Sequence, residues 1–488
     1  MKPKTTLTSL IALGLILLAS PAAHATLANN TQQVTSIPGT IGTLTNYGVL
    51  PESQNRVSFD IYNRDTYLLY SRTLSGALHC YLAISADYGV TWSANKDVPK
   101  PTDNGSHPFT SCAIATGRVT GESILYVVIA HAASGDIGTG INVDIDIGLL
   151  PDGGSLSWVS GSPFVIAASA STESFSYPTI VLDRNGYPFV AFSVVHDDVG
   201  TVNDYQNDEV CASGTTNPTA NPTWTCSSPG LTCVVGTTCP FAALTESNID
   251  TNKELPVLLA TNFDGHANPP NTIITRGLCS GSETVKCHAP SAAPTTELSN
   301  RVFWNATTST LVFDSTPASF SLANPSSAPA DQRSLSAASD NGDSQYAAFL
   351  AYADGTNVYV RTIIDPYNSW GGRTTVESGA TPHGVHETWS DAGTTSNVEI
   401  WTTVFETSTT INATAYQGGL LRTGGGIIYT NSTTPYYPTS PAVFLGGARC
   451  TPTCGTKNIN LPVAWVNQAS TRELWATGVN ATLLGING

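Results

Sequence analysis

The chain has 488 residues, of which 41% are hydrophobic and only 11% are charged, and its net charge at pH 7 is −16. This composition predicts a folded protein with a polar surface that carries few ionic groups. Because an acidic surface repels phosphate, we expect no nucleic-acid partner.

The first 25 residues predict a secretory signal peptide. Lys2 and Lys4 form a basic start, residues 10–18 form an apolar core, and residues 23–25 (Ala-His-Ala) have the small side chains of a cleavage site. The apolar run is too short to cross a bilayer. We therefore expect a secreted, extracytoplasmic protein with no membrane span.

The rest of the chain, residues 26–488, is predicted to form a single all-β domain. Short runs rich in Val, Ile, Tyr, Phe and Thr alternate with turn residues, and no amphipathic helix stands out. The clearest predicted strands are Thr66–Arg72, Ile124–Ala130, Thr179–Leu182, Phe189–Val195, Pro256–Thr261, Tyr346–Tyr352, Val358–Ile364, Val398–Phe405 and Pro462–Val466.

Two of these segments share one pattern. Residues 177–192 and 334–349 each contain a strand, a turn with Asn-Gly and a second strand, and Asn-Gly favours a type I′ hairpin. Similar units recur along the chain, and about seven units of about 45–70 residues fit it. This size is typical of the four-stranded blades of a β-propeller, and the sequence leaves six or seven blades open. The remaining units lie around residues 56–95, 110–165, 252–315, 383–430 and 438–480.

Residues 85–92 (Ser-Ala-Asp-Tyr-Gly-Val-Thr-Trp) carry the most specific pattern in the chain. Ser85 and Asp87 can bond backbone N–H groups of a tight turn, Gly89 allows a positive φ, and Trp92 provides a ring for packing. With Thr91, these residues fill every fixed position of S-x-D-x-G-x-T-W. The segment resembles the Asp-box, or bacterial neuraminidase repeat, of sialidase-like β-propellers. The resemblance implies architecture, because in that family the motif lies away from the active site.

Ten cysteines, an even number, lie close together in pairs along an exported chain, which predicts five local disulfides. Residues 200–250 and 279–300 interrupt the strand pattern, so we interpret them as loop insertions pinned by disulfides. Cys226, Cys233 and Cys239 could exchange partners. The predicted pairs are Cys80 with Cys112, Cys211 with Cys226, Cys233 with Cys239, Cys279 with Cys287, and Cys450 with Cys454.

The resemblance to sialidases implies three arginines that clamp a sugar carboxylate, together with a Tyr–Glu pair and an Asp. Arg56 lies upstream of the Asp-box, where the family has its first arginine, but its flanking residues differ from the family's Phe/Tyr-Arg-Ile-Pro. Arg276 and Arg361, near the ends of strand-like runs, are the other candidates for this clamp. No other catalytic signature is present.

Asp144 and Asp146 alternate on one face of a predicted strand. Carboxylate oxygens at this spacing could bind calcium, whereas the alternative is a pair of solvated side chains. No other cofactor is indicated.

The sequence supports two functions. The favoured one is a secreted, monomeric module that binds a glycan or an extracellular protein at or outside the cell surface. The alternative is a divergent exo-sialidase-like glycoside hydrolase.

Overall fold

The computed structural model describes a large part of the chain. The described residues are 28–37, 57–60, 65–74, 77–87, 89–93, 96–98, 109–131, 142–168, 173–183, 185–196, 205–227, 252–260, 272–279, 296–313, 318–321, 335–339, 347–354, 357–364, 369–377, 385–391, 399–406, 410–417, 420–421, 426–430, 435–439, 460–467 and 472–480.

All regular structure in this part of the chain is β-strand, which confirms the all-β prediction. Each of the nine runs predicted from sequence falls on an observed strand, although Thr179–Leu182 covers only the second half of the strand Glu173–Leu182. The described residues contain no helix, and hence no helix long and apolar enough to cross a membrane. The signal-peptide prediction concerns residues outside the described ranges.

The described strands form seven antiparallel sheets. In most of them, strands that follow one another in sequence also pair with one another. The first sheet contains β2 (Val57–Phe59), β3 (Thr66–Leu74), β4 (Ala77–Ser85) and β5 (Lys96–Asp97). The second contains β6 (Phe109–Val119), β7 (Glu122–His131), β8 (Asn142–Pro151), β9 (Ser157–Trp158) and β10 (Phe164–Ala168).

The next three sheets repeat this meander. The third contains β11 (Glu173–Leu182), β12 (Pro188–His196), β13 (Tyr205–Ser213) and β14 (Trp224–Ser227). The fourth contains β15 (Asn252–Ala260), β16 (Thr272–Cys279), β17 (Thr296–Asn305), β18 (Thr310–Phe313) and β19 (Ala318–Ser321). The fifth contains β20 (Leu335–Ser339), β21 (Ala347–Asp354), β22 (Asn357–Ile364) and β23 (Thr374–Glu377).

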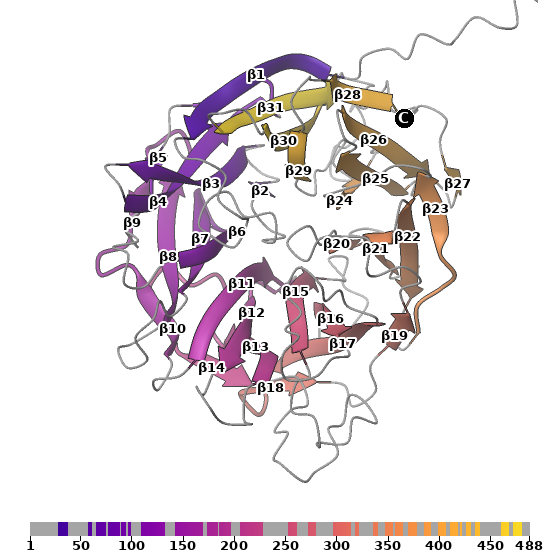
Figure 1. Cartoon of the computed structure of the whole chain (residues 1–488). Coiled ribbons are helices and arrows are strands. Elements are labelled where there is room, and N and C mark those ends of the chain that lie inside the picture. The colour runs from indigo at the N-terminus through magenta and orange to yellow at the C-terminus, as the bar shows by residue number, and fades with distance from the viewer. Residues whose placement is uncertain are drawn as a thin grey trace, which may run out of the picture.

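The last two sheets complete the set, and the final one combines both ends of the described chain. Its outer strand β1 pairs antiparallel with β31, which Figure 1 shows side by side. The sixth sheet contains β24 (Val385–Asp391), β25 (Glu399–Glu406), β26 (Thr410–Gln417), β27 (Leu420–Leu421) and β28 (Gly426–Thr430). The seventh contains β1 (Ala28–Ile37), β29 (Pro435–Thr439), β30 (Asn460–Asn467) and β31 (Arg472–Asn480).

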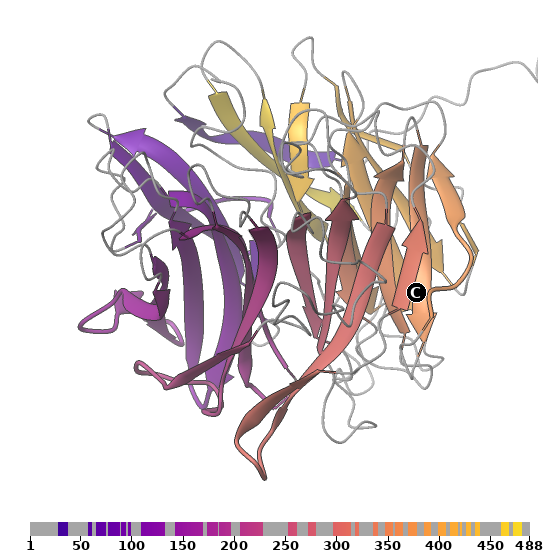
Figure 2. The same cartoon turned by 60° about the horizontal axis from the view of Figure 1, so that its bottom comes forward.

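The sheets are arranged around a common centre, with the first strand of each successive unit toward the middle (Figure 1). From β2 to β29, each of these first strands touches the first strand of the next sheet. The view turned by 60° shows neighbouring sheets side by side, with their strands running in roughly the same direction (Figure 2). Radial repetition of this kind leaves only the outer strand of each sheet as an edge.

The core lies between successive sheets. β7 shows why: every residue from Ser123 to His131 is buried, because side chains on its two faces pack against different neighbours. Ile124, Tyr126 and Val128 pack toward the third sheet, whereas Leu125 and Val127 pack toward the first. A strand buried on both faces has a continuous apolar sequence instead of an alternating one.

The last sheet also packs on the first. Ala476 of β31 belongs to the same buried cluster as Val57, Leu68 and Tyr70. The first and last units therefore share a hydrophobic contact in addition to the pairing of β1 with β31.

The Asn-Gly turn between β11 and β12 differs from the prediction. A type I′ turn would have Asn185 and Gly186 as its two central residues. Here the Gly186 N–H donates to the Asp183 carbonyl at 2.9 Å, so Gly186, with φ +86°, is the last residue of the turn. The Asp183 carboxylate instead accepts hydrogen bonds from the N–H groups of Asn185 and Tyr187, both at 2.9 Å. The second Asn-Gly pair, Asn341 and Gly342, lies outside the described residues.

Candidate binding site

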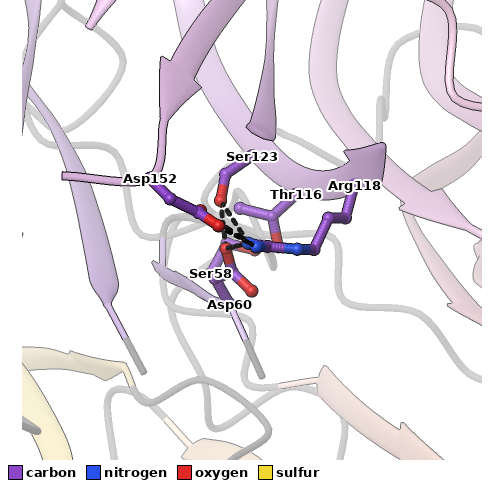
Figure 3. A network of polar contacts seen from close by, with 6 residues as sticks. All are labelled: Ser58, Asp60, Thr116, Arg118, Ser123 and Asp152. Atoms are coloured by element: carbon purple, nitrogen blue, oxygen red, sulfur yellow. Dashed lines mark hydrogen bonds and ion pairs between the residues drawn. The ribbon is translucent and has the colours of Figure 1, made fainter. Parts of the chain in front are cut away.

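Six polar side chains meet where the first two sheets touch (Figure 3). Their residues lie at strand ends or beside the β2–β3, β6–β7 and β8–β9 turns. Because strand direction alternates in each meander, these three turns share one edge of the two sheets, named here the Asp65 edge after the residue that precedes β3. The residues in the network are Ser58, Asp60, Thr116, Arg118, Ser123 and Asp152.

Arg118 is the centre of this network. Its Nη1 lies 3.2 Å from Asp60, and its Nη2 donates to both carboxylate oxygens of Asp152 at 2.9 and 2.7 Å. Ser123 donates to Asp60 and accepts from Arg118. The Asp60 side chain is 3% exposed, so the guanidinium compensates a charge that is buried between two sheets.

A hollow of about 340 Å³ opens beside the network. Gly153 in the β8–β9 turn has φ +70°, and a Cβ added there would meet no other atom within 4 Å, so the turn leaves this side open. The turn is fixed by a hydrogen bond from the Gly154 N–H to the Pro151 carbonyl at 2.8 Å. The hollow is lined by Asp65, Leu150, Pro151, Gly153 and Gly154.

Asp65 is the ionisable side chain in this lining. Partial burial and the nearby carboxylates of Asp60 and Asp152 raise the pKa of Asp65, and the hydroxyl of Tyr67 opposes that rise. The pKa of Tyr67 is itself held well above its usual range by burial and by Asp65 and Asp60. The wall of the hollow is therefore acidic, and its charge is not neutralised by Arg118, which is already bound by two other carboxylates.

The Asp-box segment lies at the same edge. Ser85 stands opposite Thr66 in the β3–β4 register, next to Asp65. The Ser85 hydroxyl donates to Asp87 at 2.8 Å and accepts from the Gly89 N–H at 2.8 Å. Gly89 has φ +81°.

Asp87 and Trp92 hold the rest of this turn. Asp87 accepts from the Thr91 N–H at 2.7 Å and from its hydroxyl at 2.6 Å, and Trp92 Nε1 donates to the Gly89 carbonyl at 3.2 Å. Although burial opposes it, the hydrogen bonds from Thr91 and Ser85 hold the pKa of Asp87 below its usual range. Each of the five fixed residues of the motif therefore makes a hydrogen bond within the segment 85–92, as a structural role requires.

Asp144 and Asp146 lie toward the opposite edge, between the first two sheets. Asp144 pairs with His131 at 3.2 Å between Oδ2 and Nε2. Asp146 is fully buried, and no described residue gives either of its carboxylate oxygens a hydrogen-bond partner. Burial, and then the charge of Asp144, raise the pKa of Asp146 to about 9. The alternative of solvated carboxylates is therefore wrong for both residues.

Calcium at these aspartates stays a prediction. Among the described residues, one set of three candidate metal ligands has its ligand atoms within 4.8 Å of one another, and it consists of Glu209, Cys211 and Cys226. The two cysteines form a disulfide, which removes their thiolates as ligands. Asp144 and Asp146 do not converge with a third ligand in this way.

Of the three candidate clamp arginines, Arg361 is the one whose side chain the structure describes. Arg56 lies outside the described residues, and Arg276 is placed only by its backbone, in β16 opposite Leu298. Arg361, in β22, donates from Nε to the Tyr352 hydroxyl at 3.0 Å and from Nη1 to the Gly371 carbonyl at 2.7 Å.

Two of the predicted disulfides are present, Cys80–Cys112 and Cys211–Cys226. The first joins β4 to β6 and so links two sheets, and the second joins the paired strands β13 and β14. Each of the other three predicted pairs includes at least one cysteine outside the described ranges, namely Cys233, Cys239, Cys287, Cys450 and Cys454.

The residues around the hollow were not predicted from the sequence. Asp60, Arg118 and Asp152 belong to no motif. Each lies beside a turn of the structure, and Gly121 and Gly153, which follow Arg118 and Asp152, are the sequence signal that could have located two of them.

Comparison with known proteins gives no family. No protein-family model matches the chain, and no protein of curated function matches it either. A Penicillium chrysogenum α-L-arabinanase complexed with arabinobiose has 13% identity and a TM-score of 0.43 over 80% of this chain and 98% of its own. A Fusarium graminearum α-L-arabinofuranosidase has 10% identity and a TM-score of 0.46 over the same shares. A Streptococcus pneumoniae sialidase has 10% identity and a TM-score of 0.44 over 93% of this chain and 71% of its own. With TM-scores below 0.5, these similarities assign neither a fold nor an activity to the chain.

Proposed function

We propose that residues 26–488 form a secreted Asp-box β-propeller that binds a glycan. Seven meander sheets around a common centre and the pairing of β1 with β31 support a propeller of seven blades. The two disulfides suit an oxidising compartment, as the signal peptide at residues 1–25 also predicts. The predicted insertion at 200–250 is wrong for residues 205–213 and 224–227, which form β13 and β14 of the third sheet, and residues 296–300 of the predicted insertion at 279–300 belong to β17. The protein acts as a monomer.

The hollow at the Asp65 edge is the observation that carries the glycan assignment. Its volume of about 340 Å³ lies at the small end of the about 300–1,000 Å³ typical of small-molecule sites. The lining combines one carboxylate with open backbone at Gly153 and with the apolar surface of Pro151. A sugar ring needs this mixture, because it presents hydroxyl groups at its rim and C–H groups on its faces. An extracellular protein is the other partner that the sequence predicts.

A sialidase-like hydrolase is the second candidate, since Arg56 lies on the expected side of the Asp-box. The contacts of Arg361 count against it. A clamp arginine directs two N–H groups at a carboxylate, whereas Arg361 already uses Nε and Nη1 inside its own sheet.

A glycan array with the purified secreted protein tests the main proposal, and a fluorogenic sialoside tests the alternative. We expect glycan binding without turnover. Turnover that Arg56→Ala abolishes without unfolding the chain would establish the hydrolase and reject the binding module. Arg373→Ala is the matched control, because Arg373 lies over the Tyr359 ring, outside the proposed clamp.

A further inference from the structure

The turn between β17 and β18 carries an acceptor sequence for N-linked glycans. Asn305, Ala306 and Thr307 match the pattern Asn-x-Ser/Thr, in which the middle residue is not proline. The structure describes the side chains of two such asparagines, Asn305 and Asn412, and it places them in opposite environments. The other acceptor sequences of the chain begin at Asn29, Asn104, Asn431 and Asn480.

Asn305 starts a tight turn that engages only the oxygen of its side chain. It pairs with Thr310 in the β17–β18 register, so residues 306–309 form the loop, and all four are exposed. The Asn305 Oδ1 accepts hydrogen bonds from the N–H groups of Thr307 at 3.0 Å and Thr308 at 3.2 Å, which is an Asx turn. No described residue bonds the Asn305 Nδ2 or the Thr307 hydroxyl. Both groups that define the acceptor sequence are therefore accessible.

The hairpin that carries Asn305 lies on the outside of the ring of sheets. β18 follows β17 outward in the order β15-β16-β17-β18, and Figure 1 shows it at the rim. Trp304, directly before Asn305, is 7% exposed and packs in the cluster shared with the third sheet. The base of the turn is therefore anchored while its loop faces solvent, so a large group attached at the loop displaces no packed side chain.

Asn412 has none of these properties. It lies inside β26, which pairs there with β25 on one side and with β28 on the other. Its Nδ2 donates to the Thr410 hydroxyl at 2.7 Å, and Thr414, the third residue of this acceptor sequence, is buried. A glycan on Asn412 would break that hydrogen bond and would crowd two strand pairings.

We propose that Asn305 is an N-glycosylation site of the secreted protein. The proposal rests on the secretion included in the proposed function and goes beyond it. The donor is an oligosaccharide carried on a polyprenyl diphosphate. A bond forms between the Asn305 Nδ2 and the anomeric carbon of the first sugar, Nδ2 loses a proton, and the bond between that carbon and the diphosphate breaks. The Asx turn persists in the product, because Oδ1 remains a carbonyl oxygen that accepts hydrogen bonds.

Peptide mapping of the full chain, expressed with its signal peptide in a eukaryotic secretory host, tests the proposal. Enzymatic release of N-glycans in water enriched in heavy oxygen leaves a labelled aspartate wherever an asparagine carried a glycan. We expect the label at Asn305 in most molecules and its absence at Asn412. Thr307→Ala should lose the Asn305 glycan, because the acceptor sequence needs a hydroxyl at this position, whereas Thr307→Ser should keep it.

Asn305→Asp is the matched control for the turn. Its carboxylate still accepts from the N–H groups of Thr307 and Thr308, so the variant should be secreted like the wild type and lack one glycan. Asn412→Gln should leave the mass of attached glycan unchanged.

The outcomes separate this proposal from glycan binding. An unlabelled Asn305, or equal labelling of Asn305 and Asn412, would overturn the glycosylation site. Neither result touches the hollow, because the hairpin belongs to the fourth sheet and the hollow to the first two. A chain that stays inside the host cell would reject secretion and this site with it.

Discussion

The disulfide between Cys80 and Cys112 joins β4 of the first sheet to β6 of the second. Both cysteines are buried in the cluster that packs these sheets together. The crosslink therefore strengthens a contact between two repeat units, which is the kind of contact on which a repeat architecture depends.

Removing this disulfide should destabilise the protein. Cys80→Ala with Cys112→Ala opens a loop of 32 residues, so the free energy of unfolding should fall by about 3–4 kcal/mol. Urea denaturation of the oxidised proteins measures the change. Cys211→Ala with Cys226→Ala is the control for a crosslink inside one sheet and should cost about 3 kcal/mol.

Hydrogen exchange distinguishes the two variants. The first should lose protection in β4 and β6, and the second in β13 and β14. An unchanged urea midpoint for the first variant would show that packing alone holds the two sheets together.

Replacing Arg118 should lower the free energy of unfolding strongly, although its side chain is partly exposed. Arg118→Met leaves the buried Asp60 carboxylate without a counter-charge, which should cost about 3–5 kcal/mol. Asp152→Asn removes the other partner, whose side chain is 45% exposed, and should cost at most about 1 kcal/mol. Thermal unfolding compares the two, and equal losses would argue against a buried pair at Asp60.

Asp146 should make the stability depend on pH. Its pKa is about 9 in the folded protein and about 3.9 in an unfolded chain. Between these values the unfolded state binds fewer protons, so the stabilisation present below pH 4 is lost progressively as the pH rises toward 9. The contribution of this group falls by about 1.4 kcal/mol per pH unit across this window.

Asp146→Asn should remove that slope and stabilise the protein by a few kcal/mol at neutral pH, on the order that linkage gives. The variant keeps Asp144 and His131, which also face this region, so the difference between the two stability curves isolates Asp146. Urea midpoints measured from pH 5 to pH 9 provide the curves. Parallel curves would mean that Asp146 is ionised and solvated in the native protein.

The strands could be predicted from sequence because their apolar runs are buried. In β7, Ile124 to Ala130 carry β-branched, aromatic and aliphatic side chains that fill both inter-sheet clusters, so composition alone identifies the strand. The turn at Asn185 and Gly186 could not be predicted from its dipeptide. The Asp183 carboxylate and the packing of Asn217 against Gly186 decide its geometry, and Asn217 is distant in sequence.

The polar network around Arg118 could not be predicted either, because its residues are distant in sequence. Asp60 and Arg118 are 58 residues apart, and Arg118 and Asp152 are 34 residues apart. Asp60 meets Arg118 because the first sheet packs on the second, whereas Arg118 meets Asp152 because β6, β7 and β8 pair in the second sheet. No local sequence pattern encodes either contact. The Cys80–Cys112 pair was predictable because the predicted signal peptide indicates an oxidising compartment, in which cysteines close together in sequence form disulfides.

Trp92 should contribute stability without affecting the hollow. Its ring is half-buried against the cluster shared by the first and last sheets, whereas the hollow lies on the side of the second sheet. Trp92→Ala should therefore cost about 2–4 kcal/mol, because it removes a large ring and its hydrogen bond to Gly89.

Trp92→Phe keeps much of the ring and should cost only about 1 kcal/mol for the lost bond. Thermal unfolding gives both values, and titration well below the melting temperature gives the affinity for the glycan ligand. We expect that affinity to match the wild type in both variants. A normal melting temperature with lost binding in Trp92→Ala would move the ligand site to the Asp-box hairpin itself.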